Sequence, residues 1–457
     1  MATSRGGVAA QVMTLSVIGL VVALLSYGVT VGSDTMWLVA LGNDIAAHRA
    51  IPVGVPFLDA DTTHWVNVPV LGELVMAGAN ALGAWGLVTL QLLLVVVTLV
   101  LLAITASRLG AADGAVAVVL FLFVVGSLSS LGVVRAQTLS LPCFAALLLL
   151  LRREQMRPSK LIWLVPAITL VWGNLHGGVL MGVAVAGCHL LFSRARRDPR
   201  TAMAVGLAMG VSLWVTPGGL RTHVYYWDVL NNAAAKRGEG LWAPLSLGSA
   251  LDIALVFAGL VLLALALVGR LPVWEYVAVV GLLVATGQTS RHGVWLLMLL
   301  VPHAARHLDR LARRRVRVPR PAPGALLGTL VIVVALGGAL PGVAQRAGAV
   351  AAAADRAERL AAQAGSDRPT LAPSPLAESL AVAGVRLWAA NPIDALPQGR
   401  QAAYLDFLAD PARFATTREH APQVVVLPAG QQPPAWIGAR YRLEAQSGPY
   451  VVYSSPR

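Results

Sequence analysis

Long apolar stretches separated by short polar loops recur along the chain from residue 8 to residue 340. They predict membrane-spanning helices, because a helix satisfies its own backbone hydrogen bonds in lipid. About eleven are expected, and several are shorter than the roughly 20 residues that a full crossing needs. They lie at residues 8–31, 86–106, 115–134, 139–151, 161–172, 178–192, 202–215, 251–268, 273–286, 294–304 and 325–340. The pattern therefore predicts an α-helical polytopic membrane protein.

Composition agrees with this prediction. Hydrophobic residues make up 57% of the 457 residues and charged residues only 12%, against about 25% charged residues in soluble proteins. A soluble enzyme, a coiled coil, a disordered chain and a collagen-like chain are thereby excluded. The net charge of +13 (35 basic minus 22 acidic residues) would suggest nucleic-acid binding in a soluble domain. Here most of the excess lies in short Arg-rich loops, where it orients the chain in the membrane, so no nucleic-acid partner is expected.

The basic loops set a predicted orientation. Residues 152–160, 194–200 and 306–320 are separated by even numbers of predicted spans, so all three fit on one side of the membrane. Basic loops are retained in the cytoplasm. We therefore expect a multi-pass protein of the cell membrane with a cytoplasmic N-terminus. The first long loop, 32–85, and the tail after residue 342 are then outside.

Three regions follow from this topology. Residues 1–342 form the predicted transmembrane domain, and its outer loop 32–85 carries two helices expected to lie on the membrane, at 37–48 and 69–82. Residues 343–375 are expected to be a surface helix and a proline-containing linker. Residues 376–457 form a predicted small exterior α/β unit without an acid–base pair or metal-ligand cluster, for which we expect an accessory role.

Polar side chains gather in the predicted outer loops, whereas the cytoplasmic loops hold mainly arginine. A functional site is therefore expected at the outer membrane surface. Nucleotide sugars and ATP are not available there, so an activated donor would be linked to lipid. The predicted spans hold few ionisable residues, which speaks against a proton-coupled transporter.

Several short motifs follow one another along the chain. The first loop holds an acidic residue at the predicted outer end of the first span, followed by two predicted interfacial helices. The motifs are Asp34-Thr35-Met36-Trp37, Gly42-Asn43-Asp44-Ile45, Pro52, Trp65-Val66-Asn67, Arg135-Ala136-Gln137, Asn174-Leu175-His176-Gly177-Gly178, Pro217-Gly218-Gly219 and Ser290-Arg291-His292. Their order resembles the GT-C superfamily of polyprenyl-phosphate-sugar glycosyltransferases, and in particular a group of bacterial membrane proteins with that architecture. The resemblance covers residues 33–307 and, more weakly, the C-terminal unit.

The sequence also departs from that group. Met36 stands where many relatives have a second tryptophan, and Val68 stands where they have histidine or glutamate. Gln398-Gly399-Arg400 replaces an Asp-Gly-Arg strand. These differences favour the alternative function, a non-catalytic scaffold or a protein that binds or translocates lipid-linked glycans.

The resemblance implies an inverting transfer of sugar from a polyprenyl-phosphate donor to a glycan or protein acceptor of the cell envelope. It assigns the catalytic base to Asp34, since the base must reach the acceptor hydroxyl. Arginine suits phosphate geometry, and a phosphate leaving group needs its charge neutralised. The residues expected to bind the donor phosphate are Arg135, His176, Arg291 and His292.

Two weaker groups complete the candidate site. Arg221, Tyr225 and Trp242 lie in the outer loop 216–250 and are candidates for sugar contacts or a lid; the alternative is an aromatic belt at the membrane surface. No cofactor is assigned. A divalent metal would use an Asp-x-Asp pair with a nearby histidine, and its weak candidate ligands are Asp59, Asp61 and His64.

Overall fold

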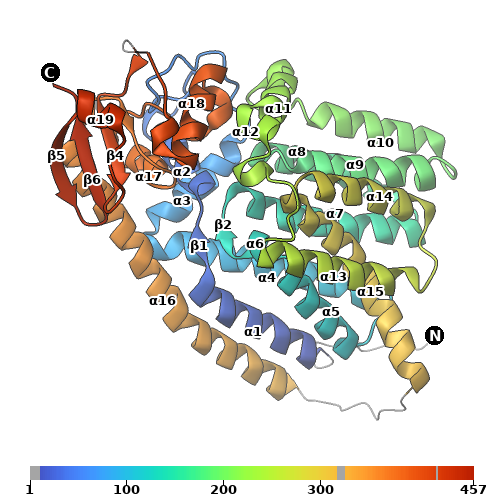
Figure 1. The fold of residues 1–457 in the computed structure, drawn as a ribbon. Helices are drawn as coiled ribbons and strands as arrows, with labels where there is room; N and C mark the ends of the chain where they lie inside the picture. The colour runs from blue at the N-terminus through green and yellow to red at the C-terminus, as the bar shows by residue number, and fades with distance from the viewer. Residues whose placement is uncertain (1–10, 316–324, 418–419, 457) are drawn as a thin grey trace. The chain divides into compact units, whose positions relative to one another are not determined.

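The structure, a computed structural model, describes residues 11–315, 325–417 and 420–456. Helices dominate it, and the strands are short (Figure 1). The chain forms two compact units that alternate along the sequence. Unit 1 comprises Met1–Thr30, Val88–Val215 and Ala243–Arg346, and unit 2 comprises Val31–Leu87, Thr216–Trp242 and Ala347–Arg457.

Unit 1 is built of helices that coincide with the predicted apolar segments. Its elements are α1 (Val12–Gly28), most of α4 (Ala84–Arg108), α5 (Asp113–Gly126), α6 (Leu128–Leu131), β2 (Val133–Val134), α7 (Ala136–Met156), η2 (Lys160–Trp163), α8 (Leu164–Leu175), α9 (Val179–His189), η3 (Leu190–Arg194), α10 (Pro199–Ser212), α13 (Ala250–Leu267), α14 (Val273–Gln288), η6 (Ser290–His292), α15 (Gly293–Arg315) and the first part of α16 (Ala325–Ala364). Each predicted span overlaps one of these helices. The predicted segment 115–134 is not one helix, because it breaks at Ser127 into α5, α6 and β2.

Three helices among the described residues are long and apolar enough to cross a membrane, at Trp85–Arg108, Ala136–Met156 and Ala250–Leu267. The other apolar helices of unit 1 are shorter or more polar, so the count of eleven crossings stays a prediction. Part of the third basic loop, at 316–320, lies outside the described residues.

Small residues let the helices of unit 1 approach closely. Helices α5, α13 and α15 pack against one another. A Cβ atom at Gly126 of α5 would lie only 2.5 Å from the Cβ atom of Ala258 on α13 and 2.8 Å from Leu297 on α15. Glycine is therefore required at this crossing, as expected for helices that associate in lipid.

Unit 2 combines segments from three distant parts of the chain. Its elements are α2 (Ser33–His48), α3 (Val70–Ala81), η4 (Gly219–Arg221), α11 (Thr222–Asn231), α12 (Ala233–Arg237), η5 (Gly240–Trp242), the end of α16, β3 (Thr370–Leu371), α17 (Leu376–Val382), η7 (Ile393–Ala395), α18 (Gln398–Ala409), η8 (Pro411–Arg413), β4 (Val424–Pro428), α19 (Ala435–Arg440), β5 (Arg442–Ser447) and β6 (Tyr450–Ser454). The short strand β1 (Thr30–Val31) lies where the chain passes from unit 1 to unit 2.

A four-stranded sheet organises the C-terminal part of unit 2, in the order β3-β4-β6-β5. Strand β3 pairs in parallel with β4, and the other two pairs are antiparallel, with Val426 opposite Val452. Strand β3 lies within the segment 343–375 that was expected to hold a linker, and both its residues are buried in this sheet. The surface helix predicted beside it is not separate either; it is the end of α16.

The first loop and the C-terminal chain share one hydrophobic core. Leu387 donates its amide to the carbonyl of Phe57 at 2.7 Å and accepts the amide of Asp59 at 2.8 Å. Leu58 and Trp65 of the loop are buried in the same cluster as Leu387. The C-terminal region and the loop that carries Asp34 are therefore parts of one compact unit.

Candidate functional site

The start of α7 holds Arg135 in a defined place in unit 1. The Arg135 side chain is only 7% exposed, and its Nη2 donates to the Ser129 carbonyl at 3.3 Å and to the Ser130 hydroxyl at 3.2 Å. Two residues later, the Gln137 amide donates to the Arg291 carbonyl at 3.0 Å. This bond ties η6 to the start of α7, so the segments that carry the two arginines are neighbours.

His176 lies in the turn between α8 and α9 and has a fixed hydrogen-bond arrangement. Its Nδ1 accepts the amide of Gly178 at 3.0 Å and contacts the Ser140 hydroxyl at 2.9 Å. The Trp172 indole donates to the Ser140 oxygen at 2.6 Å, which leaves the serine proton for His176. With Nδ1 acting as acceptor, the network assigns the neutral tautomer with its proton on Nε2.

Electrostatics agree with a neutral imidazole. Burial, reinforced by the positive charges of Arg291 and Arg135 and by His292, lowers the pKa of His176 to about 3. Burial and Arg291 lower the pKa of His292 to about 4. The four predicted phosphate ligands therefore lie within electrostatic range at one end of unit 1. They provide two cations and two neutral imidazoles, rather than the four positive charges of a fully cationic pocket.

Asp34 lies in unit 2, in the first turn of α2. The sequence places it at the end of the first span, but β1 stands between α1 and α2. Asp394 of η7 lies near it: burial, with added repulsion from Asp228 and Asp34, raises the pKa of Asp394 to about 6. The Trp65 indole donates to Asp394 at 2.8 Å. Three carboxylates from three separate segments are thus grouped in unit 2.

Asp394 could not be predicted as part of this group from the sequence. Trp65 and Asp394 are 329 positions apart, and Asp394 belongs to no motif that stands out in the sequence. Trp65 and Asp394 come together only because the C-terminal chain packs against the first loop in the folded protein.

The candidate metal ligands have other partners. Asp59 pairs with Arg386 at 3.2 Å and with Arg400 at 3.6 Å. Asp61 accepts the amide of Thr63 at 3.0 Å and its hydroxyl at 2.7 Å, and these bonds lower the pKa of Asp61. Within the described part of the chain, no group of three or more His, Cys, Asp and Glu residues could hold a metal ion.

The candidate lid residues differ in their surroundings. Arg221 is exposed and donates to the His64 carbonyl at 2.9 Å. Tyr225 is 9% exposed and packs with Val66 and Val68 in a small core cluster. Trp242 is half-buried in η5. Arg221 and Tyr225 therefore fasten α11 and its flanking turn to the first loop.

Val68 has a packing role that explains its departure from the polar residue of many relatives. It is fully buried, and a Cβ atom at Gly218 would lie 2.7 Å from Val66 and 3.2 Å from Val68. A polar side chain at position 68 would therefore be buried against the glycine turn.

Comparison with protein-family models finds no match, and comparison with curated proteins finds none either. Solved structures do match. ArnT from Cupriavidus metallidurans bound to undecaprenyl phosphate is 15% identical, with a TM-score of 0.55 over 97% of this chain and 98% of that chain. Its apo state gives a TM-score of 0.57. Both ArnT and the next match are GT-C glycosyltransferases.

That next match is the arabinofuranosyltransferase AftD from Mycobacteria, which is 16% identical with a TM-score of 0.56 over 97% of this chain and 40% of that chain. The chain has a GT-C-like fold. The resemblance noticed in the sequence is thereby confirmed at the level of the fold, across almost the whole length. A protein with this fold and with apolar helices of spanning length is a membrane protein.

Proposed function

We propose that this GT-C-like protein transfers a sugar from a polyprenyl-phosphate donor to a glycan or protein acceptor on the outer face of the cell membrane. The observation that carries the proposal is the fold shared with ArnT, which was solved with undecaprenyl phosphate bound. The grouping of Arg135, His176 and Arg291 at one end of unit 1 supports it, because a phosphate leaving group needs cations and hydrogen-bond donors.

Each candidate residue has its own task in this proposal. Asp34 takes the proton of the acceptor hydroxyl, and the acceptor oxygen forms a bond to the sugar C1. The bond between C1 and the phosphate oxygen breaks, and polyprenyl phosphate leaves. Arg135 and Arg291 neutralise that phosphate, and the Nε2–H of His176 donates a hydrogen bond to it. A single displacement of this kind inverts the configuration at C1.

The two histidines contribute differently. His292 contacts the Ala285 carbonyl through Nδ1 at 3.3 Å, and a carbonyl only accepts, so the neutral ring carries its proton on Nδ1. Its Nε2 is then an acceptor, whereas the Nε2 of His176 is a donor. His176 is therefore suited to bind phosphate oxygen, and His292 is suited to position a hydroxyl or a water.

Transfer by the purified protein tests the proposal. The protein in lipid nanodiscs would be given a panel of undecaprenyl-phosphate monosaccharides and cell-envelope acceptors, with products detected by mass spectrometry. Asp34→Asn should lower the transfer rate by about 10²–10⁴-fold, the usual contribution of a general base. Donor affinity should change little, because the substitution keeps the shape of the side chain.

Asp44→Asn is the matched control. Asp44 lies on the same helix and pairs with His48 at 3.2 Å, and it has no part in the proposed chemistry, so its variant should retain activity. Full transfer by Asp34→Asn would exclude Asp34 as the base. Tight donor binding without transfer of any tested sugar would favour the alternative, a non-catalytic lipid-glycan binding protein.

A further inference from the structure

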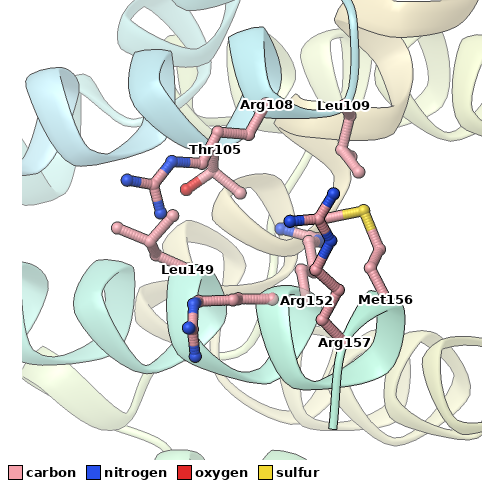
Figure 2. A pocket seen from close by; sticks show the side chains of 8 residues that line it. Thr105, Arg108, Leu109, Leu149, Arg152, Met156 and Arg157 are labelled. Atoms are coloured by element: carbon pink, nitrogen blue, oxygen red, sulfur yellow. The ribbon is translucent and has the colours of Figure 1, made fainter. Parts of the chain in front are cut away.

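A cavity of about 380 Å³ opens in unit 1 where α4 and α7 end. This volume is within the range of about 300–1,000 Å³ that is usual for small-molecule sites. Figure 2 shows Arg108 extending from α4, and Arg152 and Arg157 from the end of α7. The lining of the cavity consists of Thr105, Arg108, Leu109, Leu149, Arg152, Arg153, Met156 and Arg157.

The cavity has an excess of positive charge. Arg153 pairs with Glu154 at 3.2 Å, and Glu154 also pairs with Arg194 at 3.5 Å. One carboxylate is therefore shared by two arginines and does not neutralise both. Arg108 and Arg157 are exposed at the mouth of the cavity, and neither has a carboxylate within 4.0 Å among the residues that the structure describes. Two cations therefore face this space without acidic partners in the described chain.

Arg152 is the buried member of the lining and fixes the end of α7. Its side chain is 3% exposed; Nε donates to Glu275 at 3.1 Å, and Nη2 donates to the Leu299 carbonyl. Arg152 therefore ties α7 to α14 and α15, and the exposed cations Arg108 and Arg157 are the ones that a ligand in the cavity can reach.

Apolar side chains next to these arginines indicate an amphiphilic ligand. Leu109 and Leu149 are partly exposed in the lining, and Met156 is 52% exposed. A free phosphate ion would gain nothing from them, whereas the glycerol and first acyl carbons of a lipid would. Basic pockets at the ends of membrane helices on the cytoplasmic side are suited to anionic headgroups, and the loop after α7 is predicted to be cytoplasmic.

This cavity is separate from the proposed donor site. Helix α7 has 21 residues, and at 1.5 Å per residue it places its two ends about 30 Å apart. Arg135 precedes the first residue of α7, and Arg157 follows the last. One helix therefore has a group of cations at each end, on opposite sides of the bilayer in the predicted topology.

We propose that the cavity at the ends of α4 and α7 binds the phosphate headgroup of an anionic phospholipid. The headgroup phosphate accepts hydrogen bonds from Arg108 and Arg157, and the acyl chains run along Leu149 and Met156. The bound lipid thereby holds α4 against α7 at their cytoplasmic ends. This site is independent of sugar transfer.

Lipid titration of the full chain tests the proposal. The delipidated protein in an uncharged detergent would be titrated with phosphatidylglycerol, phosphatidylcholine or inorganic phosphate, with binding followed by native mass spectrometry and by the melting temperature. We expect bound phosphatidylglycerol and a raised melting temperature, and no comparable effect of phosphatidylcholine. The variant Arg108→Gln/Arg157→Gln should bind phosphatidylglycerol at least about tenfold more weakly, since each arginine contributes about 1 kcal/mol near an anionic lipid.

The control variant is Arg200→Gln/Arg310→Gln, which removes the same charge from exposed positions outside the cavity. It should keep the wild-type affinity within about twofold. Equal weakening in both variants would show general surface electrostatics and would overturn the proposal. So would equal binding of phosphatidylcholine, or saturation by inorganic phosphate at concentrations that displace phosphatidylglycerol. Because the readout is binding, its failure would leave the proposed transfer reaction untouched.

Discussion

Replacing His176 by asparagine separates the structural role of its ring from its proposed role toward phosphate. The Nδ1 atom accepts the Gly178 amide at 3.0 Å and the Ser140 hydroxyl at 2.9 Å. The asparagine Oδ1 can take both bonds from nearly the same place. Asparagine cannot reach as far as Nε2, so the donor toward the ligand is lost while the turn is retained.

The magnitude follows from this arrangement. A hydrogen bond to a charged group contributes about 1.5–3 kcal/mol, and 1.4 kcal/mol corresponds to a tenfold change in affinity. His176→Asn should therefore weaken polyprenyl-phosphate binding by about 10–150-fold. Its free energy of unfolding should change by less than about 1 kcal/mol. His176→Ala leaves the Gly178 amide and the Ser140 hydroxyl unpaired, and it should destabilise the protein by about 1–3 kcal/mol.

Binding and melting measured in parallel test this reasoning. Wild type, His176→Asn and His176→Ala would be titrated with undecaprenyl phosphate in detergent, and each would be melted from pH 4 to pH 8. Since the folded pKa of His176 is about 3 and the ordinary value is about 6.5, the unfolded chain takes up the proton first. Stability therefore falls as the pH drops below about 6.5, and this part of the loss should be absent in His176→Asn.

Two results would refute the assignment. Unchanged affinity in His176→Asn would show that Nε2–H makes no bond to phosphate. An affinity that rises steeply as the pH falls from 7 to 5, and does so only in wild type, would show that the ring binds as a cation.

Three further predictions concern other parts of the chain. Glu275→Gln should lower the free energy of unfolding by about 3–5 kcal/mol, because it leaves Arg152, its partner at 3.1 Å, as a buried charge without a counter-ion; the double variant with Arg152→Met should recover most of this loss in thermal melts. Asp394 has a pKa raised to about 6, so its contribution to stability is present at pH 4 and is lost as the pH rises through 6; Asp394→Asn should melt higher than wild type at pH 8 and show a flatter pH profile. In a cysteine-free background, Ser366→Cys should react with an impermeant thiol reagent from outside the cell and Arg200→Cys only after permeabilisation, and the opposite pattern would reverse the predicted orientation.

The helical part of the fold was predictable because lipid leaves an apolar stretch few alternatives to a helix. Every predicted span overlaps a helix, and the two helices predicted in the first loop coincide closely with α2 and α3. The break at Ser127 was not visible, since the apolar stretch runs through it. The short strand β3 was also missed, because its partner β4 follows more than 50 residues later.

The candidate site was predictable only in part. The Asn-Leu-His-Gly-Gly turn marks His176 in the sequence, but its neutral state depends on Ser140, which is 36 positions away, and on two arginines from other segments. Asp59 was a candidate metal ligand, and the structure shows it in an ion pair with Arg386 instead. The sequence could not predict this pair, because Arg386 lies more than 300 residues later in the chain. Pairings of this length follow from the packing of unit 2, which hydrophobic periodicity does not specify.

A cryo-EM structure of the protein with undecaprenyl phosphate would show directly where the donor phosphate binds. We expect phosphate density within hydrogen-bond distance of Arg135 or Arg291 and of His176 Nε2, at the start of α7. Density for the phosphate only at the other end of α7, or at a place remote from both arginines, would contradict the proposed donor site and the function built on it.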